Sequence, residues 1–335
     1  MNLKQLAKEL NLSISAVSKA LRDSHEISPA TKAAVLAKAK ELNYQVNPFA
    51  SSLRKQISKT IAVVIPEVVN DFFGPCINGI ESIAQEKGYH VLIYLTHEDM
   101  QREVAITKLL QNGRADGVIV SMSETTNSTK HFEELKNLEV PLVFFDRVAE
   151  LMDAPKVITD DYNSGKVATT HLIENGCKRI AFLSISNSLS ISNKRMNGYL
   201  DALNENNLKK DNSMMLWFTN DYDTNADMIR NLLKKKNRPD GIFASVEHLA
   251  ITAYEKCAEL GLSIPGDVKI ICFSNLKTAG LLSPSMTTIT QPAYEMGREA
   301  ASILFKLVEK KGHHFLLEKT VIPSKLVVRN STRVV

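Results

Sequence analysis

The sequence lacks the features that mark several large classes of protein. It has no run of about 18 apolar residues, which argues against a membrane-spanning helix. Its N-terminal residues lack the apolar core of a secretory signal, so we expect a cytoplasmic protein. The four cysteines (Cys76, Cys177, Cys257 and Cys272) form no Cys-X-X-Cys pair. That spacing argues against a zinc site or a disulfide framework and suits a reducing compartment.

Signatures of catalysis and of cofactor binding are also missing. The chain has no glycine-rich dinucleotide fingerprint, no phosphate-binding P-loop, no HExxH motif and no GxSxG motif. The carboxylate pair Asp160-Asp161 has no histidine close by in the sequence, and His313-His314 has no third ligand at metal-site spacing. We therefore expect no catalytic residue, no metal and no cofactor.

Positive charge is concentrated at the N-terminal end. The first 60 residues hold ten Lys and Arg against four Asp and Glu, whereas the rest hold 31 against 33. A basic head on a nearly neutral body fits a polyanionic partner for the head alone. Charge by itself leaves open the alternative of a solvated charged surface.

Residues 1–21 have the pattern of two short helices joined by a tight turn. The apolar residues expected to pack together are Leu3, Leu6, Ala7, Leu10, Leu12 and Val17. Asn11 suits a left-handed turn position, and Ser13 is a natural N-cap for the second helix. The second helix then directs Ile14, Ser15, Ser18 and Lys19 away from the apolar side. This is the layout of a helix-turn-helix, whose second helix enters the major groove of DNA.

Two further segments complete the N-terminal part. Ser28 and Pro29 open a third helix, whose expected apolar stripe is Val35, Leu36, Ala39 and Leu42. We place the helix-turn-helix domain at residues 1–46. Residues 47–58 begin with Asn47 and Pro48, a second capped start. Isolated helices this short are marginal in water, so we expect a hinge helix and linker there.

From residue 59 onward, strand-like and helix-like runs alternate. The strand-like runs are 60–66, 89–95, 117–121, 140–146, 179–184, 241–244 and 268–273. The helix-like runs between them include 101–112, 163–175, 194–206, 224–236 and 248–260. This alternation predicts parallel sheet with helices on both faces. The segment is too long for one such sheet, so we expect two α/β lobes.

Segments along the whole chain resemble the LacI/GalR family of bacterial transcription regulators. They include LKQLAKELNLSISAVSKAL, NPFASSLRK, TIAVVIPEVVNDFFGPCINGIE, RMNGYLDAL and PSMTTITQP, in this order. The resemblance implies an α/β protein in which the three-helix head and hinge helix precede a two-lobed, periplasmic-binding-protein-like sensor at residues 59–335. We expect lobe 1 at about 59–160 and 290–318, and lobe 2 at about 161–289 and 319–335.

The resemblance assigns DNA contacts to the second helix. Ile14, Ser15 and Lys19 match the base-reading positions of the family, and Ser13 and Ser18 match positions that contact phosphate. A lysine can donate to guanine O6 and N7, whereas Ile14 and Ser15 would read methyl groups or single base edges.

The hinge segment is expected to contact DNA as well. Leu53 matches the leucine that enters the minor groove and unstacks the central base step, and Arg54 flanks it. Asn47 caps the hinge helix and is counted with them. Because two hinge helices are needed for this wedge, the resemblance implies a homodimer on a pseudo-palindromic operator of double-stranded DNA.

The resemblance also implies an effector cleft between the lobes. Asn70-Asp71-Phe72-Phe73 matches an Asn-Pro-Phe-Phe motif with Asp71 in place of proline, and its ring would stack on an apolar sugar face. Arg195 matches a cleft arginine that donates to hydroxyls or to a carboxylate. The expected effector-binding residues are Asn70, Phe72, Phe73, Ser121, Asp146, Arg147, Asp161, Arg195, Tyr222, Glu247, Asn275 and Gln291.

Two segments depart from the family pattern. Ser245-Val246-Glu247 and Phe273-Ser274-Asn275 lack part of the Asn and Asp set that commonly holds sugar hydroxyls. An unusual saccharide, a charged sugar and a non-sugar therefore stay open as effectors.

These features predict a transcription regulator, with repression favoured, whose operator affinity is controlled by a small molecule. A sugar or sugar derivative is the favoured effector. The alternatives are a solute-binding protein without DNA function and an α/β enzyme. The basic head and the missing secretory signal count against the first, and the missing nucleophile–base pair and phosphate loop count against the second.

Overall fold

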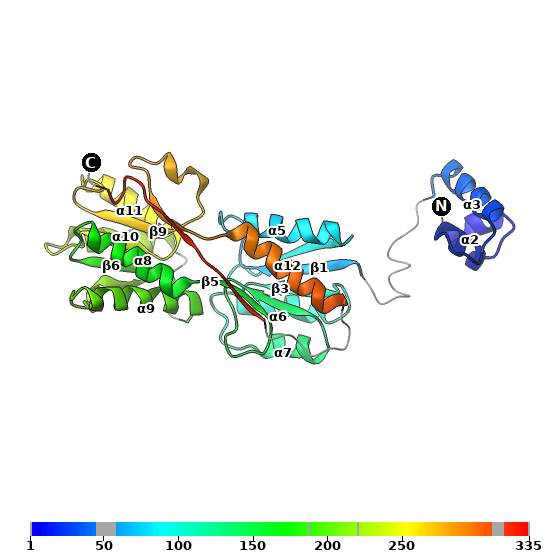
Figure 1. Ribbon diagram of the computed structural model, residues 1–335, viewed down its shortest axis with the longest axis horizontal. Coiled ribbons are helices and arrows are strands. Elements are labelled where there is room, and N and C mark those ends of the chain that lie inside the picture. Colours follow the sequence, from blue (N-terminus) through cyan, green and yellow to red (C-terminus); the bar gives the residue numbers. More distant parts are fainter. Residues whose placement is uncertain (1, 45–57, 187, 220, 310–317, 334–335) are drawn as a thin grey trace. The chain divides into compact units, whose positions relative to one another are not determined.

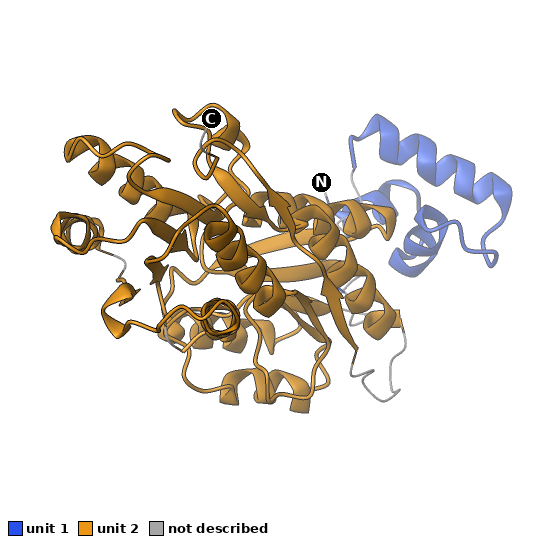
Figure 2. Ribbon diagram, turned by 60° about the vertical axis from the view of Figure 1, so that its left-hand side comes forward, with its two compact units in different colours: residues 1–58 blue, residues 59–335 orange. Residues whose placement is uncertain are grey.

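The computed structural model describes residues 2–44, 58–186, 188–219, 221–309 and 318–333 of the chain. The chain divides into two compact units, Met1–Ser58 and Lys59–Val335, which Figure 2 colours separately. Each unit has its own hydrophobic core. Among the described residues, no helix is both long and apolar enough to cross a membrane.

The first unit contains three helices, α1 (Leu3–Glu9), α2 (Ile14–Leu21) and α3 (Pro29–Glu41). Asn11 lies in the left-handed region with φ of 50°, which allows the tight turn between α1 and α2. The hydroxyl of Ser13 accepts a hydrogen bond of 3.1 Å from the backbone N–H of Ala16 and so caps α2. Both predictions for this turn are therefore confirmed.

The hydrophobic core of this unit is small and well buried. Leu6, Val17 and Val35 are completely buried, one from each helix, and they hold the three helices together. The expected stripe of α3 is wrong at Leu36, whose exposed fraction is 55%. Leu36 follows Val35 directly and therefore lies about 100° further round the helix, away from the core.

The second unit is built on two six-stranded sheets, which form two lobes (Figure 1). The strand order of the lobe 1 sheet is β11-β5-β4-β3-β1-β2, and all its neighbours are parallel. The strands are β1 (Thr60–Ile65), β2 (His90–Leu95), β3 (Gly117–Val120), β4 (Leu142–Phe145), β5 (Lys156–Thr159) and β11 (Lys319–Ile322). The lobe 2 sheet has the order β12-β10-β9-β8-β6-β7, and only β12 runs antiparallel to its neighbour. Its strands are β6 (Ile180–Ser184), β7 (Met215–Trp217), β8 (Gly241–Ala244), β9 (Lys269–Phe273), β10 (Thr287–Thr290) and β12 (Lys325–Val327).

Helices cover both faces of each sheet, as the alternating pattern predicted. The lobe 1 helices are α5 (Phe73–Glu86) and α12 (Ala293–Glu309) on one face and α6 (Met100–Leu110) and α7 (Lys130–Asn137) on the other. The lobe 2 helices are α8 (Asp161–Glu174) and α9 (Ser190–Glu205) on one face and α10 (Tyr222–Lys234) and α11 (Glu247–Glu259) on the other. Two short 3-10 helices, η1 (Asn212–Met214) and η2 (Lys277–Gly280), lie in lobe 2 loops. The expected fold class is confirmed.

We expected the chain to pass from lobe 1 to lobe 2 between residues 318 and 319, and this placement is wrong for β11, the strand that begins at Lys319. β11 pairs in parallel with β5, with Lys319 opposite Lys156, and therefore belongs to lobe 1. The chain crosses to lobe 2 only after β11, where β12 pairs with β10. Two of the segments that pass between the lobes are hydrogen-bonded to each other. Asp160, between β5 and α8, accepts with its carboxylate from the backbone N–H of Ser324, between β11 and β12, at 2.8 Å.

Two glycines bring α8 and α9 into backbone contact. A Cβ atom on Gly165 would lie 2.4 Å from the backbone oxygen of Arg195, and one on Gly198 would lie 2.1 Å from the backbone oxygen of Tyr162. Neither distance is compatible with a side chain. This close approach sets the spacing between Asp161, the first residue of α8, and Arg195 on α9.

We expect Gly198→Ala to destabilise the second unit by about 1–3 kcal/mol, because the added methyl must push the two helices apart. The free energy of unfolding in urea, followed by the fluorescence of the single tryptophan, measures the effect. Gly74→Ala is the matched control, since a Cβ on Gly74 meets nothing within 4 Å. Alanine is the better helix former, so this control should be neutral or stabilising. Equal losses in both variants would contradict the close-contact explanation.

Candidate functional site

The exposed surface of α2 begins at its N-terminal turn. Ser13 precedes the helix, Ile14 is its first residue and Ser15 follows. Ile14 keeps 46% of its surface exposed and does not join the nearby core. Ser13 and Ser15 are exposed as well. A projecting apolar and hydroxyl surface at a helix N-terminus suits contact with base edges and phosphates.

The two remaining α2 residues of interest are held by polar neighbours. Lys19 forms an ion pair with Glu26, and the side chain of Arg22 donates to the hydroxyl of Ser18 at 2.9 Å. Both interactions lie at the surface, where they contribute little to stability. They can therefore be exchanged for contacts to nucleic acid. The predicted hinge residues Asn47, Leu53 and Arg54 lie outside the described residues.

In the second unit, a pocket lies between the carboxyl ends of the two sheets. Open parallel sheets bind ligands at this edge. Nine of the twelve expected effector residues line the pocket: Asn70, Phe72, Phe73, Asp146, Arg147, Arg195, Glu247, Asn275 and Gln291. Lobe 1 contributes through the segments after β1 and β4, and lobe 2 through α9 and the segments after β8 and β9, while Gln291 follows β10.

Arg147 is buried at the lobe 1 side of the pocket with its charge already paired. Its Nη1 donates to both carboxylate oxygens of Glu98, at 2.7 and 2.8 Å. Glu98 also accepts from the backbone N–H of Glu124 at 2.7 Å, so the carboxylate is fixed from two sides. The Nε of Arg147 is buried and has no partner within the described ranges. A ligand in the pocket would satisfy this donor.

Arg195 forms the most enclosed ion pair of the lobe 2 side. Its Nε and Nη2 lie 2.8 and 2.7 Å from Oδ1 of Asp161, and both side chains are almost fully buried. Its Nη1 donates to the backbone oxygen of Ser245 at 2.7 Å, and its guanidinium stacks 3.7 Å from the ring centre of Phe273. Burial raises the pKa of the Asp161 carboxyl, and the charge of Arg195 opposes that rise.

A hydrogen-bonded chain joins the lobes at the base of the pocket. The side chain of Asn275 donates to the backbone oxygen of Gln291 at 2.8 Å and accepts from its N–H at 3.2 Å. The amide of Gln291 in turn donates to Thr159 at 3.3 Å and to Asp146 at 3.5 Å. Asp146 has a left-handed backbone with φ of 57°, an uncommon conformation for a residue other than glycine. Burial raises the pKa of the Asp146 carboxyl.

Glu247 brings a carboxylate to the opposite wall, at the first position of α11. It accepts a hydrogen bond from the hydroxyl of Ser274. Burial raises the pKa of Glu247, and the nearby charge of Asp71 raises it further. Asp71 replaces the proline of the family motif, so this substitution adds negative charge close to the pocket.

The aromatic pair of lobe 1 forms an apolar wall. The rings of Phe72 and Phe73 meet edge to face with centres 5.3 Å apart. The backbone N–H of Phe72 donates to the side chain of Asn70 at 2.7 Å, which fixes the turn that presents both rings. Only 7% of Phe72 and 1% of Phe73 is exposed, so each shows the pocket a limited apolar surface.

Three expected residues do not line the pocket. Asp161 accepts a hydrogen bond from Arg195, which lines the pocket in its place. Ser121 is fully buried after β3, and its hydroxyl has no hydrogen-bond partner among the described residues. Tyr222 lies outside the pocket lining as well: its side chain is 54% exposed and its hydroxyl donates to Glu255 on α11. Tyr222 opens α10 on the outer side of the sheet, where its ring can reach α11 instead of the pocket.

The pocket also includes residues that were not expected as ligands. They are Ile191, Ser245, Val246, Phe273 and Ser274. Four of them lie at the carboxyl ends of strands: Ser245 and Val246 follow β8, Phe273 ends β9 and Ser274 follows it. Ligands bind at this end of parallel strands, so these four residues could have been predicted from their place after a strand-like run. Ile191 lies on α9, and its sequence gives no such signal. Across the described ranges, no group of three or more metal-ligating side chains is assembled.

Comparison with known proteins gives a consistent result. Residues 169–332 match the family of periplasmic binding protein-like domains. The ribose operon repressor of Halalkalibacterium halodurans is 30% identical over 331 residues, which cover 99% of this chain and 97% of the repressor. A LacI family transcriptional regulator from Enterococcus faecium, solved with bound ribose, is 26% identical with a TM-score of 0.71, covering 81% of this chain and 98% of that one.

A solved lac repressor dimer, bound to operator and the anti-inducer ONPF, is similar over 99% of both chains with a TM-score of 0.85. Its identity to this chain is 19%, so this likeness concerns the fold alone.

Proposed function

Because the chain belongs to the LacI/GalR family of transcription regulators, we propose that it represses transcription by binding an operator and that a small molecule in the pocket between the lobes controls this binding. The observation that carries the proposal is the presence, on one chain, of the α2 surface and the interlobe pocket. The relatives are named repressors, and we assign no catalytic activity. A regulator that acts on chromosomal DNA works in the cytoplasm.

The charges of the pocket favour an uncharged polyhydroxylated effector, such as a sugar. Both arginines that line it are already paired, Arg147 with Glu98 and Arg195 with Asp161. The carboxylates of Asp146 and Glu247 add acceptors. An anionic effector would enter next to these carboxylates without a free cation to balance it. Hydroxyl groups, in contrast, can donate to the carboxylates and accept from the unpaired Arg147 Nε.

We further propose a homodimer on a pseudo-palindromic operator. The edge strand β2 supports it, because β2 ends the lobe 1 sheet and leaves Leu92 and Ile93 more than 40% exposed. Apolar side chains on both faces of an unpaired edge strand favour association with another chain. A second copy would place two helix-turn-helix units on two half-sites.

Operator binding tests the proposed function. The purified chain is titrated onto fluorescent duplexes from upstream of its own gene cluster, at fixed salt because affinity depends on it. A panel of sugars, sugar acids and amino sugars is then added. We expect a duplex that binds at least about 1,000-fold more tightly than random DNA, with affinity altered by one neutral sugar. Tight binding of a compound without preference for any duplex would support a solute-binding protein instead.

A further inference from the structure

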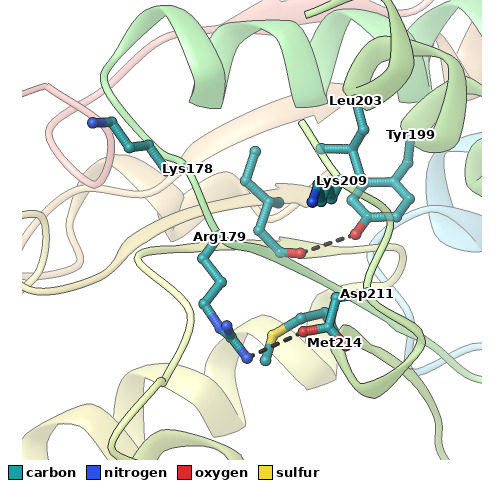
Figure 3. A pocket seen from close by; sticks show the side chains of 8 residues that line it. Lys178, Arg179, Tyr199, Leu203, Lys209, Asp211 and Met214 are labelled. Carbon is teal, nitrogen blue, oxygen red and sulfur yellow. Dashed lines mark hydrogen bonds and ion pairs between the residues drawn. The ribbon is translucent and has the colours of Figure 1, made fainter. Parts of the chain in front are cut away.

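A second pocket, of about 240 Å³, lies at the opposite edge of the lobe 2 sheet from the effector pocket (Figure 3). Lys178 and Arg179 reach it from the segment just before β6, and Lys209 and Asp211 from the segment just before η1 and β7. In a parallel sheet these segments precede the amino ends of the strands, whereas the effector pocket lies at the carboxyl ends. The two pockets are therefore separate.

Positive charge is in excess in this pocket. The residues that line it include three cationic side chains and one carboxylate, that of Asp211. Arg179 donates to Asp211 at 3.1 Å, while neither Lys178 nor Lys209 forms an ion pair with any described residue. The side chain of Lys178 lies apart from the other two and stands at the rim (Figure 3). Arg179 and Lys209 are therefore the two cations best placed to hold one ligand.

Arg179 has a donor left over. Its Nε is buried and has no hydrogen-bond partner in the part of the chain that the structure describes. A guanidinium that uses one edge for Asp211 can offer its remaining N–H groups to the oxygen atoms of a second anion. Buried donors without a partner are rare in folded proteins, so this one indicates a missing acceptor.

The rest of the pocket wall comes mainly from the largely apolar side chains of Tyr199, Leu203 and Met214. Tyr199 is 1% exposed, and its hydroxyl donates to the backbone oxygen of Ile180 at 2.9 Å, so it is not free to bind a ligand. Leu203 from α9 and Met214 from η1 line the remaining wall. A concave site of this size admits a compact molecule and excludes a nucleic acid duplex.

We propose that this site, the lobe 2 basic pocket, binds a small multivalent oxyanion, either a phosphorylated or a polycarboxylate metabolite, through Arg179 and Lys209. Asp211 competes for Arg179. Its hydrogen bonds from Ser213 and the nearby charge of Arg179 lower the pKa of the Asp211 carboxyl, so it is ionised at neutral pH. An incoming anion must therefore displace Asp211 or share the guanidinium with it.

Calorimetric titration of the full chain with pyrophosphate, at low ionic strength, tests the proposal. We expect saturable binding of one pyrophosphate per chain, and at least a tenfold higher Kd in Lys209→Ala. Lys236→Ala is the matched control, because Lys236 is an exposed lysine on the loop before β8 and does not line the pocket. Its Kd should change less than twofold. A parallel titration with citrate decides between phosphate and carboxylate ligands.

Asp211→Asn is an independent test, because it should strengthen pyrophosphate binding where Lys209→Ala weakens it. The asparagine keeps a side-chain oxygen that can accept from the backbone N–H of Ser213, as Asp211 does at 2.9 Å, but it removes the competing charge. We expect the Kd for pyrophosphate to fall several-fold. The proposal is overturned if neither anion gives saturable binding, or if Lys209→Ala leaves the Kd unchanged. It is also overturned if Lys236→Ala weakens binding as much as Lys209→Ala, since the attraction would then be diffuse.

This inference does not depend on the proposed function. Pyrophosphate binding is measured without DNA and without the effector. Loss of operator binding with intact pyrophosphate binding would count against the regulator and leave the lobe 2 basic pocket in place. The reverse result would remove the pocket and leave the regulator.

Discussion

Arg195→Leu should lower the free energy of unfolding of the second unit by about 3–5 kcal/mol, because it leaves a buried carboxylate without its partner. The carboxylate is that of Asp161, which is 2% exposed and receives both Arg195 contacts on Oδ1. Urea unfolding followed by tryptophan fluorescence measures the change. The same variant should lose effector binding, since Arg195 lines the interlobe pocket.

The loss should depend on pH in a defined direction. Burial already raises the pKa of Asp161 in the folded chain, and Arg195 counteracts the rise. Without Arg195 the folded-state pKa rises further above the unfolded value of about 3.9. Between the two pKa values the folded chain binds a proton that the unfolded chain releases, so stability falls as pH increases. The deficit of Arg195→Leu relative to the wild type should therefore be larger at pH 7 than at pH 4.5.

A double variant separates stability from recognition. Arg195→Leu combined with Asp161→Leu replaces the ion pair by apolar groups, an exchange that is often close to neutral. We expect it to recover most of the lost stability without recovering effector binding. If the double variant were as unstable as Arg195→Leu, the uncompensated Asp161 charge would not be the cause of the loss.

We expect Leu53→Ala to weaken binding to the specific operator by about two orders of magnitude, because the family resemblance assigns Leu53 the role of the minor-groove wedge and the variant would lose the contacts that the bent duplex permits. Binding to random DNA should change little, since that binding rests on phosphate contacts and counterion release. Fluorescence anisotropy with both duplexes over a series of salt concentrations measures the two affinities. The slope of the salt dependence should be the same in the variant and the wild type.

Leu36→Ala provides a matched control for this variant. It removes the same atoms from an exposed leucine in the first unit, on the surface of α3. We expect no change on either duplex. A loss of equal size on specific and random DNA in Leu53→Ala would contradict the wedge and indicate that Leu53 supports folding instead.

Periodicity predicted the elements with strong local patterns. The β-branched run at β1 and the capped starts of α2 and α3 were found because their signals lie within a few residues. β7, with three residues, and β10, with the sequence TTIT, were missed. β7 is a strand because it pairs with β6, and β10 because it pairs with β9. Pairing with another segment of the chain leaves no signal in the strand's own few residues.

The same distinction applies to the pocket. Residues that end or directly follow a predicted strand, such as Asp146 and Arg147, could be selected because parallel topology brings strand ends together, whereas Gln291 was assigned by the family resemblance alone. The position of Tyr222 outside the pocket lining could not be predicted, because the direction of a side chain at a helix start depends on how that helix packs. The pairing of Arg147 with Glu98 joins residues 49 positions apart, so no spacing rule in the sequence predicts it.

One small molecule and one operator should be coupled through this chain. The coupling is measured by the effector Kd with and without saturating operator, and by the operator Kd with and without saturating effector. Thermodynamic linkage requires both ratios to be equal, and we expect a common factor of at least about fivefold. An effector that binds the interlobe pocket while both ratios equal one would contradict the account.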